Sequence, residues 1–289
     1  MPTLRDIKRR IKAVQSTSKI TKAMKMVAAA KFRKAQQRMF EMRPYAERMN
    51  EVLSNLASGA EGELHPLLAV RPRRKIEVLV ITSDRGLCGA FNSNILKAAS
   101  RHVSQLTKEG FEVSISSVGR KSRDYHKRRN IQLRKAWTGI SGKISYPNAQ
   151  EIAAEVIENY TNETVDEVII IYNEFKSVIA QKVVITRLLP LAPIEVSGET
   201  LPVFNVIYEP SKQEIFSRLV PKNVEIQIFR ALLESQASEE AARMAAMENA
   251  TKAANDMIDS LSLQYNKARQ ASITKELMDI VGGVEALKG

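Results

Sequence analysis

The stretch FRKAQQRMFEMRPYAERMNEVLSNL, residues Phe32 to Leu56, decides the fold of this 289-residue chain. Its apolar residues recur at alternating intervals of three and four: Phe32, Ala35, Met39, Met42, Ala46, Met49, Leu53 and Leu56. That spacing is typical of a narrow coiled-coil seam with a left-handed supercoil. Pro44 is the one irregularity, because inside a helix it costs about 3 kcal/mol or bends the helix. The stretch therefore predicts one helix of a coiled coil.

The helical pattern extends upstream, with no glycine between Leu4 and Leu56. The same spacing of three and four places Leu4, Ile7, Ile11 and Val14 on one face. Between Val14 and Met24 the seam is interrupted by the polar residues Gln15 to Ser18. One interpretation of this interruption is a helix surface that faces something other than its partner helix.

A second long helix is predicted from Ser211 to Ala286. Its apolar seam consists of Met244, Met247, Thr251, Ala254, Ile258, Leu261, Tyr265 and Ala268. At about 1.5 Å per residue the two helices would be roughly 80 Å and 110 Å long, whereas the middle of the chain would fold to roughly 40 Å across. We therefore expect the two helices to project from the middle domain and to pair with each other in antiparallel fashion. Two core helices of an ordinary bundle remain an alternative, although a bundle needs a wider apolar stripe.

The middle of the chain has the alternating pattern of an α/β domain. Strands are predicted from Lys75, Phe111, Asp166 and Lys182, and helices over Asn92–Gly110 and from Tyr146. This order favours a mostly parallel, Rossmann-like sheet with right-handed crossovers. The expected domains are the first coiled-coil helix (1–57), the α/β domain (74–190), an extended linker (191–210) and the second coiled-coil helix (211–289). The segment from Pro190 to Pro210 holds four of the ten prolines.

The loop SDRGLCGAFNSN, Ser83 to Asn94, lies between a predicted buried strand and a helix. Gly86 and Gly89 match neither GxGxxG nor GxxxxGK[ST], and no lysine follows Gly89. The sequence therefore favours a tight turn formed by the two glycines, with Asp84 and Arg85 bonding locally, over a nucleotide site.

The net charge of +12 is concentrated near the N-terminus. Residues 1–50 hold fourteen Lys or Arg and three acidic residues, and a second basic run, RKSRDYHKRR, begins at Arg120. Basic arms are typical of nucleic-acid binding, so an RNA-binding protein with a basic coiled-coil arm is the alternative function. Aromatic residues, which stack on exposed bases, make up only 6% of the chain, and this argues against that alternative.

The sequence gives little basis for catalysis, and we expect no cofactor or metal. Its three histidines, His65, His102 and His126, are scattered, and the paired carboxylates Glu239 and Glu240 are predicted to lie on an exposed helical surface. Cys88 is the single cysteine, which excludes an internal disulfide. The Arg-rich N-terminus resembles a transit peptide, but the heptads begin at Leu4, so we interpret it as part of the mature coiled coil. No apolar run is long enough to cross a membrane.

Four segments together resemble the γ-subunit family of F-type ATP synthases. They are KRRIKAVQSTSKITKAMKMVAAAKFRKAQ from Lys8, ITSDRGLCGAFNSN from Ile81, ASEEAARMAAMENAT from Ala237 and LSLQYNKARQASITKELMDIVGGVEAL from Leu261. The resemblance runs from one end of the chain to the other. The regulatory cysteine pair of the chloroplast relatives is missing, so redox control of that kind is not expected.

The resemblance implies a non-catalytic rotor stalk that couples ion transport to ATP synthesis. Its coiled coil would stand inside a hexamer of α and β subunits, and its α/β domain would contact the ε subunit and the c-ring. It implies no nucleic-acid partner and no insertion into the membrane. The expected place is the cytoplasmic face of a bacterial cell membrane, as a peripheral part of the complex. The β-contact positions of the family correspond to Met24, Arg269 and Gln270.

Overall fold

A computed structural model describes residues 3–57, 65–178, 180–191, 209 and 211–286. The chain divides into two compact units. The first unit combines Met1–Ala28 with Met244–Gly289, and the second is Ala29–Arg243. Each unit contains part of both long helices, so the units are described separately below.

The two predicted long helices are confirmed. Helix α1 extends over Leu4–Ala57 and helix α5 over Lys212–Ala286, within one residue of the predicted ends. Each helix continues through an internal proline, Pro44 in α1 and Pro221 in α5. Proline removes one backbone hydrogen bond from a helix, and in both helices the neighbouring turns keep the helical conformation.

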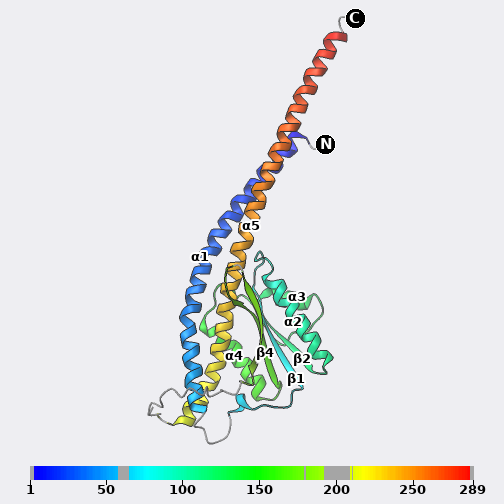
Figure 1. Cartoon of the computed structure of the whole chain (residues 1–289). Coiled ribbons are helices and arrows are strands. Elements are labelled where there is room, and N and C mark those ends of the chain that lie inside the picture. Colours follow the sequence, from blue (N-terminus) through cyan, green and yellow to red (C-terminus); the bar gives the residue numbers. More distant parts are fainter. Residues whose placement is uncertain (1–2, 58–64, 179, 192–208, 210, 287–289) are drawn as a thin grey trace. The chain divides into compact units, whose positions relative to one another are not determined.

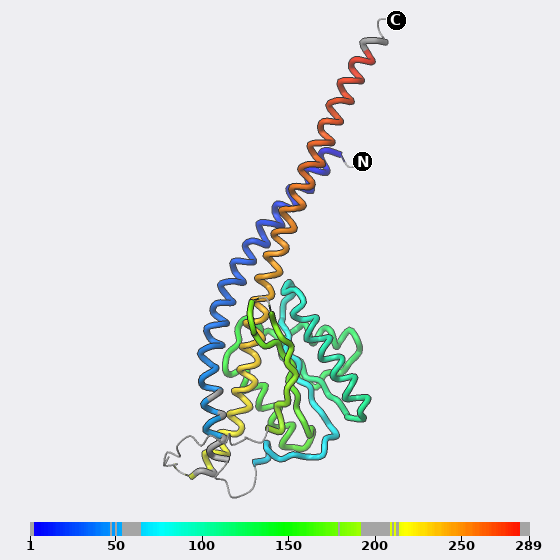
Figure 2. Tube along the Cα trace, in the orientation of Figure 1, coloured from blue at the N-terminus to red at the C-terminus, as the bar shows by residue number. Residues whose placement is uncertain are grey.

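In the first unit α1 and α5 form the predicted antiparallel coiled coil. Three side-chain contacts define the register: Ser18 with Asn255, Thr21 with Thr251, and Lys25 with Glu248. The residue numbers rise along α1 while those of the α5 partners fall, so the two helices are antiparallel. Figure 2 shows the blue start of α1 alongside the orange part of α5.

The second unit is built on a five-stranded sheet with the order β3-β2-β1-β4-β5. The strands are β1 (Lys75–Ile81), β2 (Glu112–Val118), β3 (Ala136–Trp137), β4 (Glu167–Phe175) and β5 (Gln181–Leu189). Strand β1 pairs in parallel with β2 and β4, as the alternating pattern predicted. Strand β5 is antiparallel to β4, and the sequence did not predict its direction or the two-residue strand β3.

Helices cover both faces of this sheet (Figure 1). Helix α4 (Tyr146–Thr161) packs on the face that carries Leu79 and Ile81, and helix α2 (Phe91–Lys108) packs on the face that carries Val78 and Val80. Alternate residues of β1 thus enter two separate cores, which explains why the strand is apolar on both sides. The short helix α3 (Arg120–Lys127) follows β2 and occupies the basic run that begins at Arg120. No helix was predicted there.

The predicted linker 191–210 lies, except for Leu191 and Glu209, outside the described residues. Leu191 is buried, and its N–H donates to the carbonyl of Leu67. Leu67 belongs to the 3₁₀ helix η1 (Pro66–Leu68) and is fully buried, so this contact ties the end of β5 to the segment before β1.

A buried carboxylate in the middle of the sheet provides a test of the second unit. Glu77 on β1 has no exposed surface, and burial raises the pKa of its carboxyl above the usual value, although Ser116 donates a hydrogen bond to it. A raised pKa in the folded state means that the folded protein binds the proton more tightly than the unfolded chain. Stability is therefore lost as the pH rises from the ordinary carboxyl pKa through the raised one.

We expect Glu77→Gln to stabilise the second unit relative to the parent protein at pH 8 more than at pH 4. The amide keeps the shape and an acceptor for Ser116 but carries no charge. Urea unfolding followed through Trp137, the single tryptophan and a buried residue of this unit, measures the difference. Glu112→Gln, at an exposed position of β2, is the control and should change stability by less than about 0.5 kcal/mol. A difference between Glu77→Gln and the parent that is independent of pH would contradict the expectation.

Candidate functional site

Two polar residues of α1, Ser18 and Thr21, take part in the coiled-coil seam. Thr21 is 8% exposed, and its Oγ1 lies 2.7 Å from Oγ1 of Thr251, while Ser18 donates a hydrogen bond to Asn255 at 2.9 Å. Apolar seam residues lie on both sides, with Ile7 and Ala28 buried. Within the stretch Gln15 to Ser18, only Ser18 therefore faces the partner helix, whereas Gln15, Ser16 and Thr17 are exposed, so the interpretation of a surface that faces something else fails only at Ser18. At these seam positions polar pairs replace apolar pairs, and polar pairs of this kind fix the register of paired helices.

These paired hydroxyls give a prediction for the register. Thr21→Val or Thr251→Val alone should lower the stability of the first unit by about 1 kcal/mol, because one hydroxyl loses its cross-helix partner. The double valine variant should lose less than the sum, because a methyl pair replaces the hydroxyl pair. Thermal unfolding followed by circular dichroism measures all three variants. Thr17→Val, on the exposed side of α1, is the matched control. Strict additivity of the two single changes would contradict direct coupling.

Met24 lies on α1 between Thr21 and Lys25 and is half-buried. The neighbouring Lys25 reaches across to α5 and forms an ion pair of 2.7 Å with Glu248. The thioether of Met24 is therefore held at a defined level of the coiled coil, opposite α5 residues 248–251, with part of its surface free for another molecule.

Arg269 and Gln270 lie on α5 and are both exposed. Within the described part of the chain, no acidic side chain lies within ion-pair distance of Arg269, so its guanidinium is free for a partner. Arg269 is eighteen residues beyond Thr251, which corresponds to roughly 27 Å along the helix. The structure therefore does not bring Met24 together with Arg269 and Gln270. They belong to two separate levels of the coiled coil.

The α5 helix extends beyond the part that α1 covers. From Ile273 to Gly283 every residue is exposed, although the helix continues to Ala286. Figure 2 shows the red end of α5 continuing past the N-terminal end of α1. Large apolar side chains remain on this uncovered end: Ile273, Leu277, Met278, Ile280 and Val281, each more than half exposed. A helix with this surface is expected to be covered by another molecule.

In the second unit the loop after β1 is bonded both to itself and to other loops. Arg85 bonds locally, as predicted, because its carbonyl accepts the hydroxyl of Ser83 at 2.6 Å. The carboxylate of Asp84 accepts the backbone N–H groups of Arg120, Gly139 and Ser141 at 2.9–3.0 Å. Asp84 thus caps the start of α3 and holds the loop after β3. The prediction that Asp84 bonds locally is wrong, because the bonds join segments that are distant in the sequence.

The conformation of this loop requires only one of its two glycines. Gly89 has φ +57°, in the region that favours glycine, whereas Gly86 does not have a positive φ. Leu87, between them, has φ +63°, an uncommon conformation for a leucine. The turn therefore needs a glycine only at Gly89, and the unusual backbone conformation lies at Leu87.

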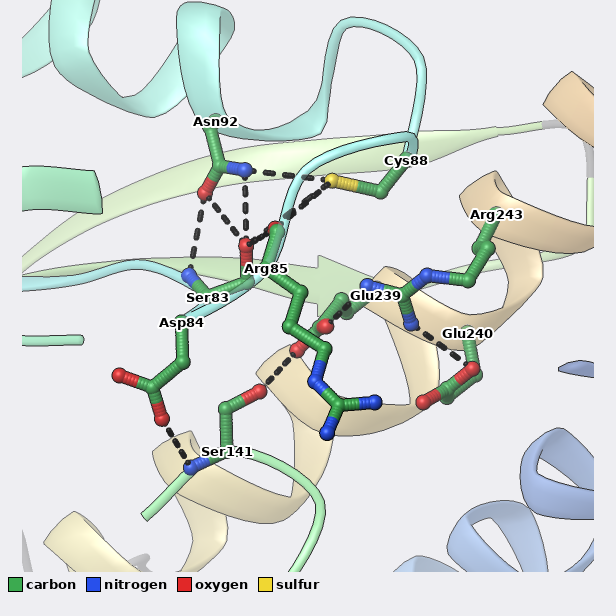
Figure 3. Close-up of polar contacts among 9 residues, drawn as sticks. All are labelled: Ser83, Asp84, Arg85, Cys88, Asn92, Ser141, Glu239, Glu240 and Arg243. Carbon is green, nitrogen blue, oxygen red and sulfur yellow. Dashed lines mark hydrogen bonds and ion pairs between the residues drawn. The ribbon is translucent and has the colours of Figure 1, made fainter. Parts of the chain in front are cut away.

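The loop faces a buried charge cluster on α5 that consists of Glu239, Glu240 and Arg243 (Figure 3). Arg243 Nη2 donates to Glu239 at 2.5 Å, and its Nη1 lies 2.8 Å from Glu240 Oε2 as an ion pair without hydrogen-bond geometry. The hydroxyl of Ser141 donates to the second oxygen of Glu239 at 2.6 Å. Because Ser141 also donates its N–H to Asp84, a chain of polar contacts connects the loop after β1 to α5.

The two carboxylates of this cluster are 5% and 4% exposed, so the prediction of an exposed helical surface at Glu239 and Glu240 is wrong. Burial raises the pKa of Glu239, and the charge of Arg243 and the hydroxyl of Ser141 oppose that rise. The sequence does contain a signal for the cluster, since Arg243 follows Glu239 and Glu240 by four and three positions and can reach both. His126 is also buried, and its Nδ1 lies 2.8 Å from the carbonyl of Ser122.

Cys88 is buried beside this loop, and burial raises the pKa of its thiol. Its Sγ accepts a hydrogen bond of 3.2 Å from the side-chain Nδ2 of Asn92, a residue in the first turn of α2. A thiol with a raised pKa is a weak nucleophile. Among the described residues, no group of His, Cys, Asp and Glu side chains is arranged to hold a metal ion.

Comparison with known proteins decides the family. The family model described as ATP synthase matches residues 3–287. The ATP synthase gamma chain of Anaeromyxobacter sp. (strain K) is 50% identical over 291 residues, and that of Pelotomaculum thermopropionicum is 48% identical over 288 residues, each covering both chains completely. The chain belongs to the ATP synthase gamma-chain family. A gamma chain is a non-catalytic subunit that forms the rotor stalk of the complex.

Solved structures agree with the family. The central stalk and c-ring structure of the Tetrahymena thermophila mitochondrial ATP synthase contains a chain that is 31% identical, with a TM-score of 0.59, and the match covers 80% of this gamma chain and 99% of that chain. A chain of the Euglena gracilis mitochondrial enzyme, 23% identical, supports the fold with a TM-score of 0.69, covering 98% of this gamma chain and 94% of that chain. None of the described helices of this gamma chain has an apolar stretch long enough to cross a membrane.

Proposed function

We propose that this gamma chain turns inside an α–β hexamer and couples ion-driven rotation of a c-ring to ATP synthesis, as a peripheral part of the complex on the cytoplasmic face of the cell membrane. The observation that carries the proposal is the end-to-end match to gamma chains at about half identity. The uncovered, apolar end of α5 supports it, because a sleeve of other subunits would cover that surface. The ε subunit and the c-ring are the proposed partners of the α/β domain.

The proposed β-contact residues are Met24, Arg269 and Gln270. Arg269 is exposed and has no acidic neighbour among the described residues, so its guanidinium can form a two-pronged bond to a carboxylate of the β subunit. Gln270 adds a neutral donor next to it, and Met24 offers an adaptable apolar contact at the other level. Two shallow contacts at different heights suit an axle that must be held and released three times in each turn.

The proposal is tested by co-expressing the tagged chain with α and β subunits and following rotation of a probe. Cys88 is buried and has a raised pKa, so a cysteine introduced at the exposed Lys108 can be labelled selectively. We expect α and β subunits to co-purify with the chain and the probe to rotate in one direction when ATP is added. The parent chain, which keeps only Cys88, is the control for labelling.

Two outcomes would contradict the proposal. One is a complex that hydrolyses ATP while a probe at position 108 stays still. The other is co-purification of RNA in place of α and β subunits, which would favour the alternative of an RNA-binding protein. The family relationship offers no support for that alternative.

A further inference from the structure

The basic run that begins at Arg120 is not used by the rotor function described above, and it borders a hollow on the second unit. The hollow lies between α2 and α3 and has a volume of about 400 Å³. That volume falls within the range of small-molecule sites, which is about 300–1,000 Å³. Four of its nine lining residues are lysine or arginine, and their charged groups favour an anionic ligand.

Four cations and one carboxylate line the hollow. Lys97 comes from α2, and Lys121, Arg128 and Arg129 come from α3 and the residues that follow it. The carboxylate is Asp124, and its pKa is lowered by a hydrogen bond from Arg123, which is a neighbour outside the hollow. The side chains of Lys97, Lys121 and Arg128 have no carboxylate within 4.0 Å in the described part of the chain. The lining thus carries an uncompensated positive charge.

The spacing of the cations along α3 places them on one side of the helix. The face that turns toward α2 carries three cations and one tyrosine at intervals of four, three and one: Lys121, Tyr125, Arg128 and Arg129. Like charges on one face repel each other and destabilise a helix. When like charges cluster on a helix face with no opposite charges of the protein to neutralise them, the cluster often marks a functional site.

Two sets of contacts around Tyr125 hold the walls of the hollow in place. Tyr125 Oη lies 3.0 Å from Oγ of Ser100, which connects α3 to α2. The guanidinium of Arg129 stacks 3.6 Å above the ring of Tyr125 and donates to the carbonyl of the same residue. Stacking leaves the edge of a guanidinium free to donate to an anion. The side chain of Lys121 extends to Gly86, where a Cβ would lie only 3.7 Å from its Nζ.

The positive end of the α2 helix dipole, at the start of the helix, also favours an anion in the hollow. Asn92 and Ser93, in its first turn, line the hollow, and the N-cap residue Ala90 has no side chain that can satisfy the free N–H groups. An uncapped helix start attracts negative charge and is often occupied by phosphate. The start of α3 is different, because Asp84 and the hydroxyl of Thr82 already accept its N–H groups.

From these contacts we propose that the α2–α3 hollow binds a phosphate group. Its four cations would pair with a dianion, and the arginine edges and the start of α2 would donate hydrogen bonds to the phosphate oxygens. Inorganic phosphate, pyrophosphate and the headgroup of an anionic phospholipid all present this chemistry. The site is distinct from the glycines of the loop after β1, which do not form a phosphate-binding loop.

The test measures binding of three probes to the full chain by titration calorimetry at low ionic strength: inorganic phosphate, pyrophosphate and vesicles that contain phosphatidylglycerol. If the ligand is a free phosphate, we expect saturable binding of one phosphate or pyrophosphate per chain. If the ligand is a lipid headgroup, we expect saturable binding of the vesicles instead. Lys121→Gln combined with Arg128→Gln should weaken whichever binding is seen by about tenfold or more, since each lost charge-assisted bond contributes substantially to affinity.

The matched control combines Lys108→Gln with Lys143→Gln, which removes two exposed cations of the same unit that do not line the hollow. Both double variants change net charge equally, so a general electrostatic effect would weaken binding in both. Equal loss in the two variants, or no saturable binding of any probe to the parent chain, would overturn the proposal. Because the chain is tested without α and β subunits, a negative result leaves the rotor function unaffected, and failure of rotation leaves this binding unaffected.

Discussion

Arg243→Ala is expected to lower the free energy of unfolding of the second unit by about 3–5 kcal/mol, the largest effect of any single change considered for this chain. The substitution leaves Glu239 and Glu240 buried without their cation. Two adjacent carboxylates cannot both stay ionised in such a place at low cost, and only Ser141 continues to donate to Glu239. The cost arises from the charges that remain rather than from the contact that is lost.

The loss should depend on pH in a direction that follows from the structure. Burial already raises the pKa of Glu239, and Arg243 opposes this rise. Without Arg243 the pKa in the folded state rises further above that of the unfolded chain. Protonation then protects the variant at low pH, and stability is lost as the pH rises. The gap between variant and parent should therefore be larger at pH 8 than at pH 5.

Urea unfolding followed through Trp137 measures this gap, since that buried residue belongs to the same unit. The matched control adds Glu239→Gln and Glu240→Gln to Arg243→Ala. The triple variant carries no buried charge at these positions and should recover most of the loss. A loss below about 1 kcal/mol in Arg243→Ala, or an equal loss in the triple variant, would show that the cluster does not behave as a buried charge network.

The same cluster illustrates why part of this molecule could not be predicted from the sequence. The long helices were predicted to within a residue, because heptad spacing runs along a large part of each of them. Burial at Glu239 and Glu240 was missed because charged residues in a helix are usually exposed. Here β4 and the loop after β3 cover this side of α5, with Ser141 bonded to Glu239 and Ser238 bonded to the carbonyl of Asn173. Coverage by segments distant in the sequence leaves no periodic signal.

The limits of prediction in the sheet have a similar origin. Strand β1 was predicted from its apolar run, but the direction of β5 depends on its pairing with β4. Helix α3 was missed because eight mostly charged residues bury little apolar surface, and its start is fixed by Gly119 and by Asp84 from another loop. Gly119 has φ +95°, and a Cβ there would lie 2.2 Å from the carbonyl oxygen of Thr82. Only the folded structure shows that contact.

Arg269→Ala should lower ATP turnover, or the ATP yield per ion transported, by about tenfold or more in the assembled complex, while the chain itself stays folded. The residue is exposed on α5, and an alanine at an exposed helical position costs little stability. One well-made charged contact with a β subunit is worth about 1.5–3 kcal/mol. Losing it would weaken one step of the catalytic cycle at the β sites rather than assembly. Arg269→Lys should restore only part of the turnover, because an ammonium lacks the planar fork of the guanidinium.

The comparison that decides this prediction uses Lys267→Ala as the matched control. Lys267 is also exposed, and it lies two positions earlier, on the opposite flank of the seam residue Ala268. If an acidic β loop faces only the flank of Arg269, the control should keep nearly full turnover. Subunit stoichiometry, turnover and coupled synthesis are measured on the same preparations, which separates assembly from catalysis. Full assembly with unchanged turnover and unchanged synthesis in Arg269→Ala would exclude this residue as a rotor contact. Equal losses in both variants would point to general electrostatic attraction between the basic helix pair and the surrounding α and β subunits. A specific two-pronged bond depends on the position of the cation, whereas general attraction depends only on charge.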